Sequence, residues 1–156
     1  LKDGLPISSS RIRKYIRTGN IIAAKELLGY HPKYDGVVIQ GNHVGKTLGY
    51  PTANLKFDKN IILPKPGVYA TQVLFNNKRY RAISNIGFRP TYAGATLCFE
   101  THILEFSLDI YGKSLEVEII DRIRDEVKHA NANALKKQIA LDIETALYMH
   151  EQTCVL

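Results

Sequence analysis

The segment GVYATQVLFNNKRYRAISNI, residues 67–86, decides the fold of the central part of the chain. Its two halves, 67–75 and 78–86, are rich in β-branched and aromatic residues, which favour β-strands. Asn76 and Asn77 lie between them, and asparagine tolerates the positive backbone φ angles of a two-residue hairpin turn. The segment therefore predicts two antiparallel strands joined by a tight turn.

Three further segments carry strand patterns on either side of this hairpin: 34–40 (YDGVVIQ), 96–106 (TLCFETHILEF) and 115–123 (LEVEIIDRI). At the start of 115–123, apolar and acidic residues alternate, as expected for a strand with one buried face. Five or six antiparallel strands separated by turn signals favour a small closed barrel. The predicted fold class is mainly β.

Helical patterns flank these strands. Residues 7–28 read as helix, with the serines at 8–10 as candidate N-caps. A second short helical piece over 21–28 ends at Gly29, a typical stop residue. Residues 132–149 repeat apolar side chains every four positions, which predicts an amphipathic helix that covers one side or opening of the barrel.

Composition narrows the class of protein. The chain has 156 residues, a formal charge of +6 and 45% hydrophobic residues, and no apolar run approaches a membrane span. No secretory signal is visible, and Cys98 and Cys154 lack C-x-x-C partners, so we expect reduced thiols and a cytoplasmic protein. The basic excess favours a small phosphorylated ligand over nucleic acid. Much of this positive charge lies near the start of the sequence, at Arg11, Arg13, Lys14 and Arg17.

The stretch GNHVGKTLGYPTANL, residues 41–55, is the first candidate for a binding site. Its glycines, Gly41, Gly45 and Gly49, let a ligand approach the backbone closely, and exposed N–H groups can cradle phosphate oxygens. The segment is one residue short of a P-loop and is followed by Pro51 rather than a helix, so a P-loop fold is rejected. A plain loop between strands remains an alternative.

Thr52 and Asn54 follow these glycines. They are two residues apart, so in extended chain their side chains point to the same side. A hydroxyl and an amide oxygen suit Mg²⁺, which usually keeps several water and phosphate ligands. The alternative is that both side chains bond only to the local backbone in a turn.

Glu100, in CFETHIL, shares one strand face with Cys98 and His102. A carboxylate on a partly apolar face can act as a general base for a substrate hydroxyl, or it can form a structural salt bridge. The residues alone leave both open. No metal-type spacing accompanies His102, so we expect a packed or hydrogen-bonded neighbour rather than a metal ligand.

Several motifs resemble, in order, the riboflavin kinase domain over about residues 34–150: the 41–55 stretch, PGVYA at 66–70, SNIGFRPTY at 84–92 and ETHILEFSLDIYGKSLEVEIIDRIRDE at 100–126. The segment ISSSRIR, residues 7–13, resembles a motif near the end of the FMN adenylyltransferase domain. That domain precedes the kinase in bacterial bifunctional enzymes. The resemblance implies an incomplete adenylyltransferase tail at 1–30 and a kinase barrel at 31–156.

The resemblance implies a particular fold, a particular activity and particular site residues. The fold would be a six-stranded antiparallel Greek-key barrel with a C-terminal helix and a short N-terminal helical tail. The activity would be transfer of the γ-phosphate of ATP to the terminal ribityl hydroxyl of riboflavin, giving FMN and ADP. Glu100 would be the catalytic base, and Thr52 and Asn54 would bind Mg²⁺. ATP would also contact Gly41, Gly45, Lys46, Thr47, Gly49 and Pro51, and the flavin would contact Ile123, Arg124 and Glu126.

The partner domain in cis would be the adenylyltransferase, and no FAD synthesis is expected from this chain itself. The sequence departs from the family pattern in two segments that are expected to contact ligands. Val44 and Lys46 stand where arginines are common, and His129 stands where an aromatic residue often packs at the flavin end. Lysine keeps the charge but loses the bidentate fork of arginine.

Three rival functions follow from these observations. The first is a kinase weakened by the loop changes, and the second is a non-catalytic flavin- or nucleotide-binding regulatory barrel. The third is a nucleic-acid-binding barrel that uses the basic helix around 11–17, whose affinity would collapse with salt. A pure binding protein has no need of a base at Glu100.

Overall fold

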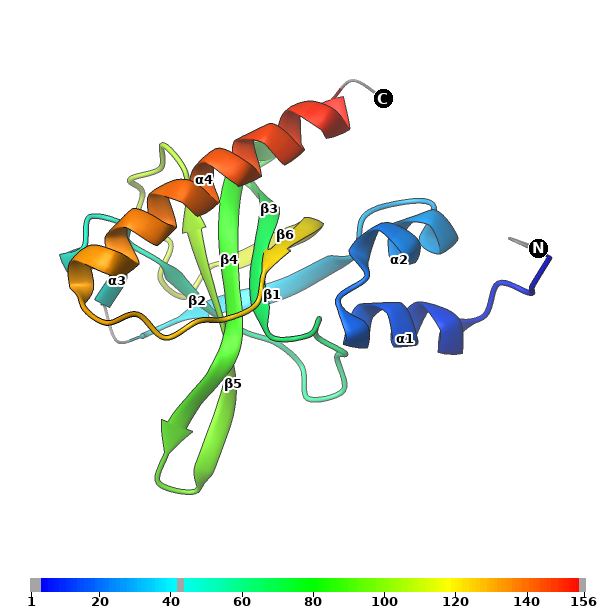
Figure 1. Ribbon diagram of the computed structural model, residues 1–156, viewed down its shortest axis with the longest axis horizontal. Helices are drawn as coiled ribbons and strands as arrows, with labels where there is room; N and C mark the ends of the chain where they lie inside the picture. The colour runs from blue at the N-terminus through cyan, green and yellow to red at the C-terminus, as the bar shows by residue number, and fades with distance from the viewer. Residues whose placement is uncertain (1–3, 42–43, 155–156) are drawn as a thin grey trace.

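The computed structural model describes residues 4–41 and 44–154 (Figure 1). The helices are α1 (Ser9–Thr18), α2 (Ile21–Leu28), α3 (Val44–Thr47) and α4 (Ala132–Cys154). The strands are β1 (Lys33–Ile39), β2 (Ala53–Lys56), β3 (Gly67–Phe75), β4 (Lys78–Thr91), β5 (Gly94–Ile103) and β6 (Ser114–Arg124).

The six strands close into a barrel in the order β1-β2-β5-β4-β3-β6, and all neighbouring pairs are antiparallel. Strands β3, β4 and β5 form a meander, and β6 returns beside β3, which is a Greek-key connection. Inward-facing side chains from all six strands fill the barrel. Its largest fully buried members include Tyr69, Phe99, Ile86, Leu115 and Ile119. The predicted fold class is confirmed.

The predicted hairpin is confirmed in detail. Asn76 and Asn77 have φ angles of 49° and 62°, and β3 pairs with β4 from Gly67 opposite Ile86 to Phe75 opposite Lys78. Strand β4 runs beyond the predicted end at residue 86, and with β5 it forms a long hairpin that projects from the barrel (Figure 1). Pro90 is tolerated there because the projecting part is paired on one side only.

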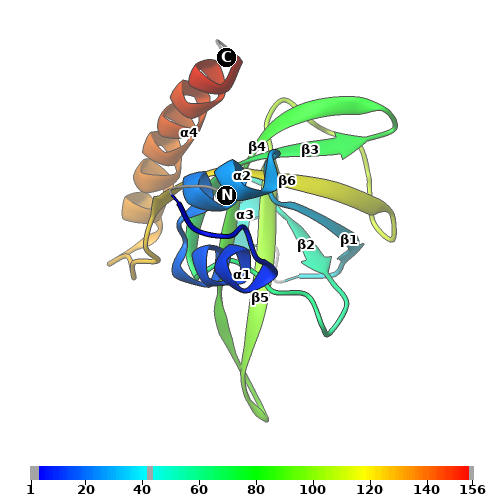
Figure 2. The same cartoon turned by 90° about the vertical axis from the view of Figure 1, so that its right-hand side faces the viewer.

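Helix α4 lies along the outside of the barrel (Figure 2). Ala146, with Ile139 and Ile143, packs against a second apolar cluster on the outer faces of the strands. The helix continues to Cys154, five residues beyond the predicted end at 149, because Met149 and the buried His150 still face the barrel. The strand members of the cluster are Ala70, Ile83 and Ile120.

The N-terminal helices form as predicted. The Ser8 hydroxyl accepts from the Arg11 N–H at 3.3 Å, and Gly29, with a φ of 83°, ends α2. Helix α2 buries Ile21 in the main core, whereas α1 has no buried residue. The tail is thus attached to the barrel through α2. In the described part of the chain, no helix has the length and apolar character needed to cross a membrane.

Two histidines make the fold sensitive to acid. Burial lowers the pKa of His31 and of His150, so both are neutral in the folded chain at neutral pH. In the unfolded chain they titrate near 6.5, and below that pH the unfolded state binds more protons. The free energy of unfolding should therefore fall as the pH drops below about 6.5. Thermal unfolding followed by circular dichroism between pH 7.5 and 5.5 measures this, and His150→Gln should reduce the decrease; an unchanged decrease would refute the role of His150.

Candidate active site

The strand register brings the predicted catalytic and metal residues together on the outer face of the barrel. Asn54 on β2 lies opposite Glu100 on β5, and Glu100 lies opposite Asn85 on β4. The row continues through Val68 on β3 to Arg124 on β6. Directly opposed residues in antiparallel strands point to the same face with their Cβ atoms about 4.5–5.5 Å apart. Side chains that are far apart in sequence therefore form one continuous row.

Two cavities lie along this row. The larger, of about 570 Å³, is bounded by the row from Glu100 to Arg124, by the start of α4 and by the segment 126–129. Glu100 and Arg124 line it, together with apolar side chains that include Leu48, Val68, Ile83, Phe88, Val127, Leu135 and Ile139. The smaller, of about 300 Å³, is lined by Lys46, Thr52 and Asn54 among others. Thr52 lines both cavities, so they adjoin at this residue.

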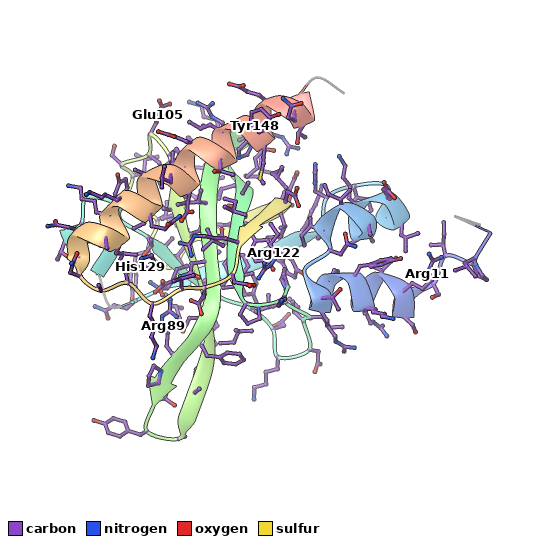
Figure 3. The ribbon with its side chains drawn as sticks, in the orientation of Figure 1. Arg11, Arg89, Glu105, Arg122, His129 and Tyr148 are labelled. Carbon is purple, nitrogen blue, oxygen red and sulfur yellow. The ribbon has the colours of Figure 1, made fainter. Side chains whose placement is uncertain are left out.

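Arg89 links two of the three acidic residues that line the larger cavity, Glu100 and Glu126. Its Nη2 lies 3.5 Å from Glu100 Oε2, and its Nη1 donates to Glu126 Oε1 at 3.0 Å. Gly87 makes room for this pair, because a Cβ there would lie 2.0 Å from Glu126 Oε1. Arg89 and His129 lie on the same side of the molecule, below the first turns of α4 (Figure 3). Sequence reasoning missed Arg89, although it lies within SNIGFRPTY.

Arg124 is fixed by helix α4. Its Nε and Nη2 donate to the two oxygens of Asp142 at 2.9 and 2.8 Å, and the Asp142 side chain is only 3% exposed. Gln138 donates to the same carboxylate at 3.0 Å. A bidentate pair of this kind holds the guanidinium in one orientation, so Arg124 presents a fixed positive charge to the larger cavity.

Close packing explains two glycines of the 41–55 stretch, and backbone conformation explains the third. A Cβ on Gly41 would lie 1.8 Å from Asn54 Nδ2, and one on Gly45 would lie 2.3 Å from the Tyr50 carbonyl oxygen. Gly49 has a φ of 86°. Asn42 and His43 lie outside the described residues, and so does the side chain of Val44, so the predicted closure of this loop over phosphates stays a prediction.

The other predicted residues divide between the cavities. Gly41, Lys46 and Pro51 line the smaller one, and Gly45 and Glu126 line the larger one. The structure places Ile123 instead against the apolar cluster beneath α4. Thr47 and Gly49 belong to the α3 region but are not among the residues that line either cavity.

His102 has the structural role expected of it. Its Nδ1 donates to the Pro51 carbonyl oxygen at 2.7 Å, and its ring meets Tyr50 edge-on with centroids 5.5 Å apart. These contacts hold the end of the glycine-rich segment on β5. Nearby, burial raises the pKa of the Cys98 thiol, which is free. Over the described residues, no group of three or more His, Cys, Asp or Glu side chains could hold a metal ion.

The substitution Gly41→Ala tests whether ligand binding depends on the position of the Asn54 side chain. The added methyl group would overlap the Asn54 amide and displace it from its place beside the smaller cavity. The resemblance implies that Asn54 binds Mg²⁺ together with ATP; if so, the KM for Mg·ATP should rise about ten-fold, with the KM for the second substrate nearly unchanged. Gly36→Ala is a matched control, because its Cβ would lie 2.7 Å from the Phe57 ring and Gly36 lines neither cavity. An unchanged KM for Mg·ATP in a folded Gly41→Ala protein would contradict the assignment.

These features define a small-molecule-binding β-barrel with two adjoining sites and a carboxylate at their junction. The family model described as Flavokinase: Riboflavin kinase matches residues 28–150, and this chain belongs to the riboflavin kinase family.

Curated relatives agree with this assignment. The chain is 39% identical over 145 residues to the bifunctional riboflavin kinase/FMN adenylyltransferase of Haemophilus influenzae, covering 92% of this chain and 47% of that protein. It is 38% identical over 144 residues to the protein of the same name from Escherichia coli K12, covering 92% and 46%. The chain thus spans about half the length of the curated relatives it matches.

Solved structures confirm the fold. A chain from Streptococcus pneumoniae, described as a macrolide-efflux protein, has a TM-score of 0.88 and 39% identity, over 93% of this chain and 48% of that one. The riboflavin kinase of Trypanosoma brucei has a TM-score of 0.54 and 23% identity, over 76% of this chain and 79% of that one. At that identity the second likeness concerns the fold alone.

Proposed function

We propose that this chain transfers the γ-phosphate of ATP to the terminal ribityl hydroxyl of riboflavin, producing FMN and ADP. The observation that carries the proposal is the junction of the two cavities. Thr52 lines both, and Asn54 beside it lies opposite Glu100 across the β2–β5 pair. A phosphate donor in one cavity and an acceptor in the other would meet at this junction.

We assign the nucleotide to the smaller cavity. Lys46 lines that cavity and carries a positive charge suited to phosphate oxygens, and one acidic residue, Asp109, also lines it. Leu108 and Tyr111 also line it and are 59% and 55% exposed, so they offer apolar surface to a nucleotide base. Gly41, at the same wall, leaves room for the Asn54 side chain to lie against the backbone.

Thr52 and Asn54 fit a weakly held Mg²⁺. Both line the smaller cavity, both carry oxygen donors, and two neutral ligands leave most of the coordination shell for water and phosphate. When bound, the ion would neutralise charge on the β- and γ-phosphates during transfer. The chain's own contribution is to position these two oxygens next to Glu100.

We assign the flavin to the larger cavity. Its volume of about 570 Å³ is typical of small-molecule sites, and its apolar wall suits a planar aromatic ring. Arg124 and Glu126 supply charged hydrogen-bonding groups at its edge. His129, in the segment that closes this cavity, takes the place of the aromatic residue common in the family.

Glu100 is the proposed base. As the terminal hydroxyl oxygen bonds to the γ-phosphorus, the bond to the β–γ bridging oxygen of ATP breaks, and the hydroxyl proton passes to the Glu100 carboxylate. Arg89 lies 3.5 Å from that carboxylate and also holds Glu126, so it orients the Glu100 side chain. Phosphoryl transfer needs mostly positioning and charge neutralisation, which these groups provide.

The longer relatives suggest a setting for this chain. We propose that it is the kinase portion, residues 31–156, of a cytoplasmic bifunctional protein whose adenylyltransferase domain lies in cis. Residues 1–30 would be the end of that domain, and this chain alone would not make FAD. The names of the relatives, which combine both activities, support this proposal.

The test is FMN formation by the isolated chain, followed by liquid chromatography. Riboflavin, ATP and Mg²⁺ together should yield FMN, and omission of ATP or chelation of Mg²⁺ should abolish it. A folded chain that binds flavin and nucleotide but forms no FMN would instead support the regulatory barrel. Addition of FMN and ATP should give no FAD.

A further inference from the structure

Asn85 lies in the active-site row without an assigned role. It is directly opposite Glu100 on β5 and Val68 on β3, and its side chain lines the larger cavity. Its Oδ1 is buried and, in the described part of the chain, has no hydrogen-bond partner. Hydrogen bonding among the described residues gives no reason for an amide at this position.

An unpartnered buried amide oxygen is uncommon, because folding removes its hydrogen bonds to water without replacing them. The terminal torsion of asparagine is soft, so the amide of Asn85 can turn either its oxygen or its NH₂ group toward the cavity. A ligand hydroxyl both donates and accepts hydrogen bonds. It can therefore pair with this amide in either orientation, which a purely donating or accepting group cannot do.

The position of Asn85 relative to Glu100 indicates which ligand atom it meets. Cross-strand neighbours have Cβ atoms about 4.5–5.5 Å apart, a span of only a few bonds in a carbon chain. If Glu100 holds the terminal hydroxyl of the ribityl chain, the secondary hydroxyls lie within reach of Asn85. Val68, on its other side, is apolar and suits the ring end of the flavin.

We propose that Asn85 binds a secondary hydroxyl of the ribityl chain while Glu100 holds the terminal one. This inference rests on the proposed kinase function and deepens it. Asn85 is then a specificity residue, which favours substrates with a polyol chain over substrates with a plain alkyl alcohol. The contact also holds the terminal hydroxyl in register with the γ-phosphate.

The test compares two substrates and three proteins. The substrates are riboflavin and 7,8-dimethyl-10-(5-hydroxypentyl)isoalloxazine, which keeps the ring and the terminal hydroxyl but lacks every secondary hydroxyl. The proteins are wild type, Asn85→Leu, which has a similar shape but no amide, and Asn60→Leu. Asn60 is exposed in a turn and lines neither cavity, so it is a matched control. If Asn85→Leu does not fold, Asn85→Ala replaces it.

Asn85→Leu should lower kcat/KM for riboflavin about 10- to 100-fold, as expected for loss of one or two hydrogen bonds in a buried site. For the hydroxypentyl flavin, wild type and Asn85→Leu should agree within about two-fold, as should their KM values for ATP. If Asn85→Leu loses kcat/KM equally on both substrates, or on neither, the inference about Asn85 is overturned while the proposed function stands. A folded wild-type chain that phosphorylates neither flavin overturns the proposed function and the inference with it.

Discussion

Replacement of Glu100 by glutamine is expected to lower kcat about 10²- to 10⁴-fold, the range for loss of a general base. Glutamine has nearly the same shape but cannot accept the hydroxyl proton. Arg89 keeps its 3.0 Å contact with Glu126, so the larger cavity should hold its form. Steady-state kinetics should therefore show a large fall in kcat with little change in the KM for ATP.

The matched control is Glu105→Gln. Glu105 is exposed and follows the end of β5, away from Arg89 and the larger cavity (Figure 3). This variant should retain wild-type rates. If Glu100→Gln keeps more than about a third of the activity, Glu100 is not the base. If it loses nucleotide binding in proportion to activity, its role is in binding rather than catalysis.

The second large effect is expected at Asp142. Its carboxylate is almost fully buried and forms the bidentate pair that fixes Arg124. Removal of one partner of a buried pair leaves an uncompensated charge, at a cost of about 3 kcal/mol. Asp142→Ala should therefore lower Tm by roughly 6–12 °C in a domain of this size.

Riboflavin binding should weaken in the same variant, because the released Arg124 no longer presents a fixed charge to the larger cavity. Glu144→Ala removes an exposed carboxylate from the same helix and should leave both quantities unchanged. Differential scanning calorimetry and the KM for riboflavin give the two readouts. A variant with wild-type Tm would show that the pair contributes nothing to holding α4 on the barrel.

The sequence was informative where a local signal determines the structure. Asn76 and Asn77 adopt the positive φ angles that a two-residue turn requires, so the hairpin could be predicted from two residues. The same holds for the cap at Ser8 and the stop at Gly29. The PTAN segment indicated oxygen ligands on one side of an extended chain.

The sequence was insufficient to predict which strands pair when the strands are distant in the chain. Strand β2, Ala53–Lys56, is only four residues long and has little strand pattern of its own. It is held by its pairing with β1 on one side and with β5, which lies far along the chain, on the other. The opposition of Asn54 and Glu100 follows from that pairing and has no sequence signature.

Contacts between distant parts of the chain also explain why the sequence did not indicate roles for Arg89 and Asn85. Arg89 reaches Glu126, 37 positions away, and its role depends on the room left by Gly87. Asn85 is distinguished by an amide oxygen that has no hydrogen-bond partner among the described residues, which a sequence pattern does not reveal. The end of α4 was predicted too early because its packed face continues through the polar side chain of His150, which an apolar repeat does not register.

A crystal structure of the chain with Mg²⁺, ADP and FMN tests the two-cavity arrangement most directly. We predict ADP in the smaller cavity beside Lys46, and FMN in the larger cavity. The FMN oxygen that joins the phosphate to the ribityl chain should lie within hydrogen-bonding distance of Glu100, with Mg²⁺ held by Thr52 and Asn54. FMN in the smaller cavity, or a phosphate remote from Glu100, would contradict the account.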